Sequence, residues 1–157
     1  MRKFEKISFE QFKKDISDDK ELYESYLLPK RSTKNSAGYD IASLEGYTLK
    51  PGEAHIFVTG LKVSMNSDEV LYLYGRSSFG YKYNITLANS VGVIDSDYYG
   101  NPDNDGHFMF AYYNFFNEDV VIKKGDVIGQ VIFQKYLVTD DDNATGMRTG
   151  GFGSTDK

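Results

Sequence analysis

The sequence predicts an all-β fold of the sandwich or barrel type, and three observations lead to this prediction. Short runs rich in Val, Ile, Tyr and Phe recur from residue 37 onward, separated by turn-forming residues. Aromatic residues reach 15%, with 13 Tyr and 11 Phe, and aromatic and β-branched side chains favour strands. Fifteen glycines supply the turns that many short strands require. Regularly spaced short strands are typical of antiparallel sandwiches and barrels.

The N-terminal region is the exception, because residues 8–28 have a helical pattern. Ser8 followed by Gln11 makes a capping box, and apolar residues recur at helical spacing at Phe9, Phe12 and Ile16. We interpret residues 1–30 as a helical extension that packs on a sheet.

Strands are expected in order along the rest of the chain. Segment 46–65 contains two strands around the turn at Pro51-Gly52, and the five consecutive apolar residues 70–74 predict a strand buried on both faces. Further strands are expected in NITLANSVGVI (84–94), GHFMFAYYNFF (106–116), DVVI (119–122) and DVIGQVIFQKY (126–136), with the turn KKGD (123–126) joining the last two.

Two polar segments interrupt or follow these strands. NPDNDG (101–106) is rich in turn formers and is expected as a surface excursion at a hairpin tip. The tail 139–157 is glycine-rich with little apolar content and is expected to be mobile. The prediction is one domain over 1–157, with a β core at 31–138.

Composition excludes several classes of protein. The net charge of −5 argues against a protein that coats nucleic acid, so no direct nucleic-acid partner is expected. No cysteine is present, which excludes disulfides and thiolate metal sites. No run resembles a signal peptide or reaches membrane-spanning length. We expect a cytoplasmic protein of a bacterium or phage-infected cell, without a membrane partner.

Small polar clusters bounded by glycines break the β pattern in several places. Each alone is more often a turn or an edge-facing side chain, but their combination needs an explanation. The clusters are SAGYD (36–40), GRSSFG (75–80), IDSDYYG (94–100) and RTGGFGST (148–155), together with the lone amide of Gln130 in an apolar run.

The chemistry of these clusters indicates a phosphorylated ligand. Arg76 offers a fork of donors, and Ser77 and Ser78 offer hydroxyl and backbone N–H groups, which suit phosphate. The spacing matches neither a P-loop nor a nucleophile elbow. Asp40 and Asp95 supply carboxylates for Mg²⁺ or for general-base catalysis. The segment GGFGST adds a second glycine-rich phosphate loop, with an aromatic residue for stacking on a ring. Together these residues predict a nucleoside polyphosphate ligand.

Five of these segments, in order, resemble the five motifs of the trimeric dUTP diphosphatases (dUTPases). They are SAGYDIAS, GRSSFGYK, NSVGVIDSDYYG, GDVIGQVIF and RTGGFGST, and they extend from about Ser36 to Thr155. The third motif, G-x-I-D-x-x-Y-x-G, is matched at every fixed position. The resemblance implies a distorted β-jelly-roll or barrel and a homotrimer with its sites at subunit interfaces.

The third motif implies the chemical step and the nucleoside pocket. Asp95 matches the general base that activates water for in-line attack on the α-phosphorus of dUTP, which gives dUMP and pyrophosphate. Tyr98 matches the residue that packs under the deoxyribose and rejects UTP. Asn89, Gly92 and Ile94 belong to the hairpin that resembles the uracil pocket, whose tightness would exclude thymine.

The remaining motifs imply phosphate, metal and lid contacts. Arg76, Ser77 and Ser78 match the motif that binds the phosphate chain, with Arg76 either on the polyphosphate or bracing the Asp95 region. Gln130 matches a glutamine near the phosphates, and Asp40 matches an aspartate that holds Mg²⁺ through water. In the tail, which would close over a neighbouring chain, the resemblance implies substrate contacts from Arg148, Phe152, Gly153 and Ser154.

The sequence departs from the family pattern in four places. One residue, instead of two, separates Arg148 from Gly150, which weakens the contact that the resemblance implies between Arg148 and the γ-phosphate, and Asp156 stands where a final glycine is common. The 101–106 excursion and the N-terminal helix are additions typical of phage and Gram-positive members. Asp97, which the motif does not fix, is interpreted as structural and on the same strand face as Asp95. Some phage members also bind a transcriptional repressor, so a repressor is a possible partner.

Two other functions remain open on this fold. A dCTP deaminase shares the fold and a serine–arginine phosphate loop, but it needs a catalytic glutamate in the base pocket. A non-catalytic nucleotide-binding regulator is the third hypothesis, although Asp95, Tyr98, Arg76 and Ser77 are all present.

Overall fold

The computed structural model describes residues 1–151, and its main elements are antiparallel strands. The elements are β1 (Lys3–Lys6), α1 (Phe9–Asp15), α2 (Lys20–Ser25), β2 (Tyr39–Ala42), β3 (Tyr47–Leu49), β4 (Ala54–Val58), β5 (Leu61–Ser64), β6 (Glu69–Gly75), α3 (Ser77–Tyr83), β7 (Ile85–Leu87), β8 (Gly92–Asp95), the 3₁₀ helix η1 (Ser96–Tyr98), β9 (Met109–Asn114), β10 (Val120–Ile122) and β11 (Val127–Lys135).

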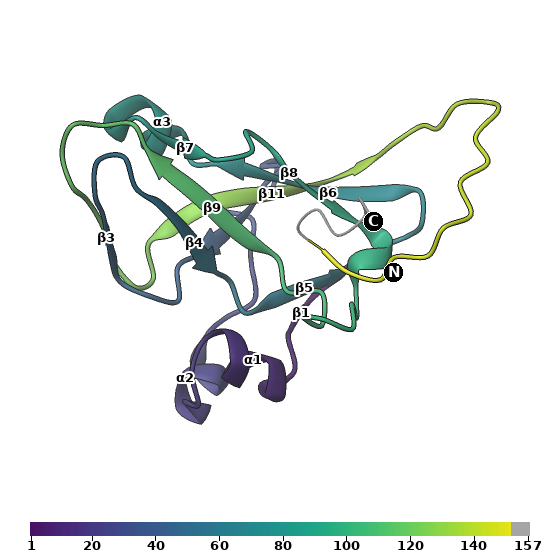
Figure 1. Cartoon of the computed structure of the whole chain (residues 1–157), viewed down its shortest axis with the longest axis horizontal. Coiled ribbons are helices and arrows are strands. Elements are labelled where there is room, and N and C mark those ends of the chain that lie inside the picture. The colour runs from purple at the N-terminus through teal and green to yellow at the C-terminus, as the bar shows by residue number, and fades with distance from the viewer. Residues whose placement is uncertain (152–157) are drawn as a thin grey trace.

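The strands form two larger sheets and two short pairs within the described residues. One sheet has the order β2-β11-β6-β8 and the other β4-β9-β7, while β1 pairs with β5 and β3 with β10. Figure 1 shows α1 and α2 beneath the β1–β5 pair, whereas α3 lies on the other side of the strands. The all-β prediction is confirmed.

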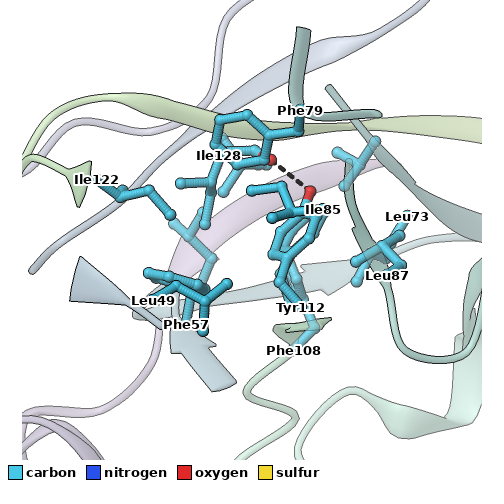
Figure 2. Close-up of a cluster of buried hydrophobic side chains, with 14 of the residues drawn as sticks. Leu49, Phe57, Leu73, Phe79, Ile85, Leu87, Phe108, Tyr112, Ile122 and Ile128 are labelled. Atoms are coloured by element: carbon cyan, nitrogen blue, oxygen red, sulfur yellow. Dashed lines mark hydrogen bonds between the residues drawn. The ribbon is translucent and has the colours of Figure 1, made fainter. Parts of the chain in front are cut away.

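Side chains from ten of the described elements meet in one core. The burial of β9 alternates strictly, as does that of β7 and β10, because successive strand side chains point to opposite faces. In Figure 2 the ring of Tyr112 from β9 lies at the centre, and its hydroxyl donates to the backbone carbonyl of Ile128. The side chains drawn around it include Leu49, Phe57, Leu73, Phe79, Ile85, Leu87, Phe108 and Ile122.

The segment GRSSFG is helical, which the sequence pattern did not predict. Residues Ser77–Tyr83 form α3, which ends at Asn84 in the left-handed conformation (φ 49°). Phe79 is buried and its ring packs edge-on against Tyr112, with centroids 5.4 Å apart. Burial of this one aromatic side chain anchors a helix that is otherwise exposed.

The N-terminal region contains two short helices and a strand. The Ser8 hydroxyl accepts the N–H of Gln11, as the capping box predicts. The Gln11 amide instead donates to Asp15, and the N–H of Ser8 donates to Asp105 in the 101–106 segment. Strand β1 was not expected. In the described part of the chain, no helix is long and apolar enough to cross a membrane.

A buried histidine joins α1 to the strands. The side chain of His107 is 0% exposed, and its Nε2 accepts the backbone N–H groups of Thr59 (3.3 Å) and Gly60 (2.9 Å). Its Nδ1 therefore carries the proton and donates to Asp15 at 2.6 Å. Burial lowers the pKa of His107, and the bond to Asp15 opposes this effect.

We expect the free energy of unfolding to decrease as the pH falls from about 7 to 5. The unfolded chain protonates His107 near its ordinary pKa of about 6.5, whereas the folded chain does so only at lower pH, so protons favour the unfolded state in this window. Urea denaturation at several pH values measures the slope. His107→Gln, which keeps an acceptor and a donor, should flatten it, and equal slopes in the two proteins would contradict this assignment.

Candidate active site

The first part of the candidate site is a cavity of about 170 Å³ at the end of β8. Asp95 is the last residue of β8, opposite Val70 of β6, and its side chain is half exposed. The structure brings together here most of the residues predicted for the uracil pocket and for the chemical step. The lining residues are Leu73, Asn89, Gly92, Val93, Ile94, Asp95, Tyr98, Phe108, Met109 and Arg148.

Gly92 allows the two strands behind this cavity to approach closely. A Cβ at Gly92 would lie 2.8 Å from the Cβ of Leu73, closer than real Cβ contacts. The turn that precedes β8 places Ser90 at φ 64°. Gly92 therefore contributes only backbone to the lining of the cavity, which suits recognition of a base edge by main-chain groups.

Tyr98 is a buried residue that lines the same cavity. It ends η1, and 6% of its surface is exposed. Its hydroxyl donates to the carbonyl of His107 (3.3 Å) and accepts the amide of Asn104 (2.6 Å). Burial raises the pKa of Tyr98, which the Asn104 bond partly offsets, so the phenol stays protonated at neutral pH.

Arg148 of the C-terminal segment lies over this cavity. In Figure 1 the chain after β11 extends outward and then returns toward the ends of β6 and β8. The Arg148 guanidinium pairs with Asp95 and, at 2.8 Å through Nε, with Asp97. The hydrogen bond to Asp97 raises the pKa of Arg148. The proposed base is therefore ion-paired to its own chain in this structure.

The second part of the candidate site is a separate cavity of about 330 Å³. It is lined by Asp40, Arg76, Ser77, Ser78, Val127, Gly129 and Gln130, which include every residue predicted to contact phosphate except those of the tail. Ser77 and Ser78 begin α3, so their backbone N–H groups have no partner inside the helix. The Arg76 guanidinium donates to the carbonyl of Val127 at 3.2 Å.

Strand pairing explains why these residues meet. Asp40 of β2 lies opposite Gln130 of β11, which lies opposite Tyr74 of β6, two residues before Arg76. Gly38 gives the Gln130 side chain its room, because a Cβ there would overlap the side-chain oxygen of Gln130. The Ser32 hydroxyl donates to Asp40. Sequence reasoning missed Ser32, since nothing in the sequence relates it to Asp40.

The two cavities lie at opposite ends of β6. Asp95 pairs with Val70 near the start of this strand, whereas Arg76 follows its last residue. A strand rises about 3.3 Å per residue, so the two positions are roughly 20 Å apart. This separation of the two backbone positions is longer than a triphosphate chain.

Two predictions about local structure are wrong. Asp97 lies in η1 rather than on an extended strand, and it binds Arg148. Residues 101–106 are not a hairpin tip, because the flanking strands β8 and β9 belong to different sheets. The two roles predicted for Arg76, on the polyphosphate or bracing the Asp95 region, stay predictions.

Some predicted residues fall outside this description, and some observed ones were not predicted. Phe152, Gly153 and Ser154 lie outside the described residues. The sequence did not predict the hydrogen bond between Asn104 and Tyr98, because NPDNDG contains only common turn formers. No group of three or more His, Asp or Glu in residues 1–151 is placed to hold a metal ion without other ligands.

The fold and these two cavities define a β-jelly-roll protein with a carboxylate-centred nucleoside pocket and a separate arginine–serine pocket. The dUTPase family model matches residues 24–156. The chain belongs to the dUTPase family, and the jelly-roll prediction is confirmed.

Relatives and solved structures agree with this assignment. A deoxyuridine 5'-triphosphate nucleotidohydrolase of Lactococcus lactis is 52% identical over 130 residues, which cover 82% of this chain and 87% of the relative. The enzyme of that name from Desulfitobacterium hafniense is 38% identical over 136 residues, covering 82% and 86%.

Among solved structures, the dUTPase of Streptococcus mutans superposes with a TM-score of 0.72 at 39% identity, covering 87% of this chain and 98% of that one. A mutant dUTPase of phage phi11 of Staphylococcus aureus, described with a structural Mg(II) ion, shares the fold with a TM-score of 0.66 at 19% identity, covering 93% and 97%.

Proposed function

We propose that this chain hydrolyses dUTP to dUMP and pyrophosphate. The observation that supports this most directly is the cavity that joins Asp95 and Tyr98 to Asn89, Gly92 and Ile94. It places a half-exposed carboxylate in the lining of a small pocket that also includes the aromatic ring of Tyr98 and the backbone of Gly92. This is the arrangement that a deoxyuridine with its α-phosphate at the mouth requires.

Pocket size sets the specificity for the base and the sugar. Because Gly92 packs closely on Leu73, the pocket has no spare room beside the edge of a bound uracil. The methyl group of thymine is therefore excluded. The buried ring of Tyr98 lies where a 2′-hydroxyl would need space. Discrimination of this kind depends on steric exclusion and leaves dUTP as the preferred substrate over dTTP and UTP.

Asp95 performs the chemical step as general base. A water molecule gives its proton to the Asp95 carboxylate as its oxygen attacks the α-phosphorus. The bond from that phosphorus to the α,β-bridging oxygen breaks, and pyrophosphate leaves with the bond electrons. Before this step Arg148 has to release Asp95, because a carboxylate in an ion pair is a weaker base.

The second cavity holds the β- and γ-phosphates. Arg76, Ser77, Ser78 and Gln130 are hydrogen-bond donors around it, and Asp40 is its only acidic lining residue among those described. The oxygen atoms of this cavity are suitable ligands for Mg²⁺, but they are too few to surround the ion. This fits an Mg²⁺ ion whose other ligands are water and the substrate phosphates. When bound, Mg²⁺ neutralises phosphate charge. Asp40 would hold it through water, with Ser32 orienting the carboxylate.

A complete site needs more than one copy of the chain. The β6 spacing keeps the two cavities of one chain apart, so the Asp95 cavity of one subunit has to face the Arg76 cavity of another. A closed homotrimer satisfies this requirement three times with one interface. The tail from Thr139 onward acts as a lid in this arrangement. A repressor partner stays a prediction from the resemblance to phage members.

The test is pyrophosphate release from dUTP, dCTP, dTTP and UTP, each with Mg²⁺ and with EDTA. We expect rapid release from dUTP alone, and only with Mg²⁺. Ammonia from dCTP would indicate a deaminase, although the described lining of the Asp95 cavity contains no glutamate. Binding of dUTP without any turnover would indicate a regulator and contradict the proposal.

A further inference from the structure

Residues 101–106 form a compact loop that packs against the backbone of Tyr98. The N–H of Asn101 donates to the carbonyl of Tyr98 (3.1 Å), and the N–H of Asp105 donates to the carbonyl of Asn101 (2.7 Å). Gly106 has φ +81°, and a Cβ there would lie 2.6 Å from the carbonyl oxygen of Tyr98. Only glycine allows this approach. The backbone of the loop is therefore in contact with the backbone of Tyr98.

Asn104 is the residue of this loop that reaches the phenol of Tyr98. Its Nδ2 donates to the Tyr98 hydroxyl at 2.6 Å, and its Oδ1 accepts the N–H of Gly106 at 3.1 Å. The second bond fixes which end of the amide faces the phenol, because a backbone N–H needs the oxygen. The hydroxyl in turn donates to the carbonyl of His107. Both hydrogen-bonding capacities of the phenol are used.

The loop is itself held by the N-terminal extension and β5. Asp105 accepts the N–H of Ser8 (2.7 Å) and the ammonium of Lys62 (2.9 Å). His107, directly after the loop, is bonded to Asp15 of α1. The loop that carries Asn104 is therefore anchored at three points outside the nucleoside cavity.

We propose that Asn104 is a positioning residue that sets the discrimination between deoxyribose and ribose by fixing the ring of Tyr98. The inference rests on the proposed function of the Asp95 cavity. The Tyr98 hydroxyl is the side-chain atom farthest from the backbone, so a change in χ1 moves it more than any other atom of the side chain. The hydrogen bonds that join this hydroxyl to Asn104 and His107 therefore fix the position of the far end of the ring. The height of the ring then decides whether a 2′-hydroxyl has room.

The expected effect is on selectivity rather than on turnover of dUTP. Asn104→Ala removes one hydrogen bond from a buried phenol and should lower the ratio of kcat/KM for dUTP over UTP roughly tenfold, mainly because UTP improves. Tyr98→Phe keeps the ring, removes the hydroxyl and should change the ratio by a similar factor. It leaves the bonds within the loop intact.

A double-mutant cycle separates this role from a general structural one. If Asn104 acts through the phenol, Asn104→Ala should change the ratio little further in a Tyr98→Phe background. Asp103→Ala is the matched control, because Asp103 is an exposed residue of the same loop and only its backbone N–H is bonded. This control should keep the parental ratio.

Two outcomes would overturn the proposal. One is additive loss of selectivity in the double variant, which would place the action of Asn104 elsewhere. The other is an unchanged ratio in Tyr98→Phe, a result that decides the question even if Asn104→Ala fails to fold. Failure of the proposed function itself is distinguishable, since the parental protein would then release no pyrophosphate from dUTP.

Discussion

Asp95→Asn should lower the rate of dUTP hydrolysis about 10²- to 10⁴-fold, the usual contribution of a general base, while dUTP still binds. Asparagine has the shape of aspartate but cannot accept the proton of the attacking water. The binding groups of both cavities are untouched by the change. Single-turnover pyrophosphate release measures the rate, and titration calorimetry with a non-hydrolysable dUTP analogue measures the binding.

Asp97→Asn is the matched control for this experiment. Asp97 lies two residues away and also binds Arg148, so its substitution loosens the tail without removing the proposed base. Because exposed ion pairs contribute little, we expect hydrolysis within about fivefold of the parental rate. Parental hydrolysis by the Asp95→Asn protein would show that the base is assigned wrongly.

Mixed assemblies of two inactive variants should recover activity, because the two cavities of a complete site belong to different chains. Asp95→Asn disables one cavity and Arg76→Ala impairs the other. When the two variants are unfolded, mixed in equal amounts and refolded, half of the chains supply each intact cavity. Random assembly then makes about a quarter of the sites fully intact, which predicts about a quarter of the parental rate.

A site contained within one chain predicts a different result. Each mixed assembly would then contain only single-defect sites, and the mixture would be no more active than the better variant refolded alone. That outcome would contradict the separation along β6, where Asp95 lies opposite Val70 and Arg76 follows Gly75. Each variant refolded separately provides the baseline.

The sequence by itself determined the fold class and singled out most of the residues that line the two cavities. The apolar run at 70–74 became β6, and KKGD became the turn before β11. These features depend on local preference and on strand periodicity, which any short stretch of sequence displays. The motif residues were readable for the same reason, since each cluster lies within a few consecutive positions.

Only the tertiary structure decided how those residues are grouped. Strand register places Asp40, Gln130 and Arg76 in one cavity and Asp95 with Tyr98 in another. The helix α3 exists because Phe79 is buried on Tyr112, a contact that no local pattern contains. The pairing of Arg148 with Asp95 and of Asn104 with Tyr98 likewise depends on how the chain returns on itself. Contacts between distant positions are set by packing and register, and a single sequence does not display them.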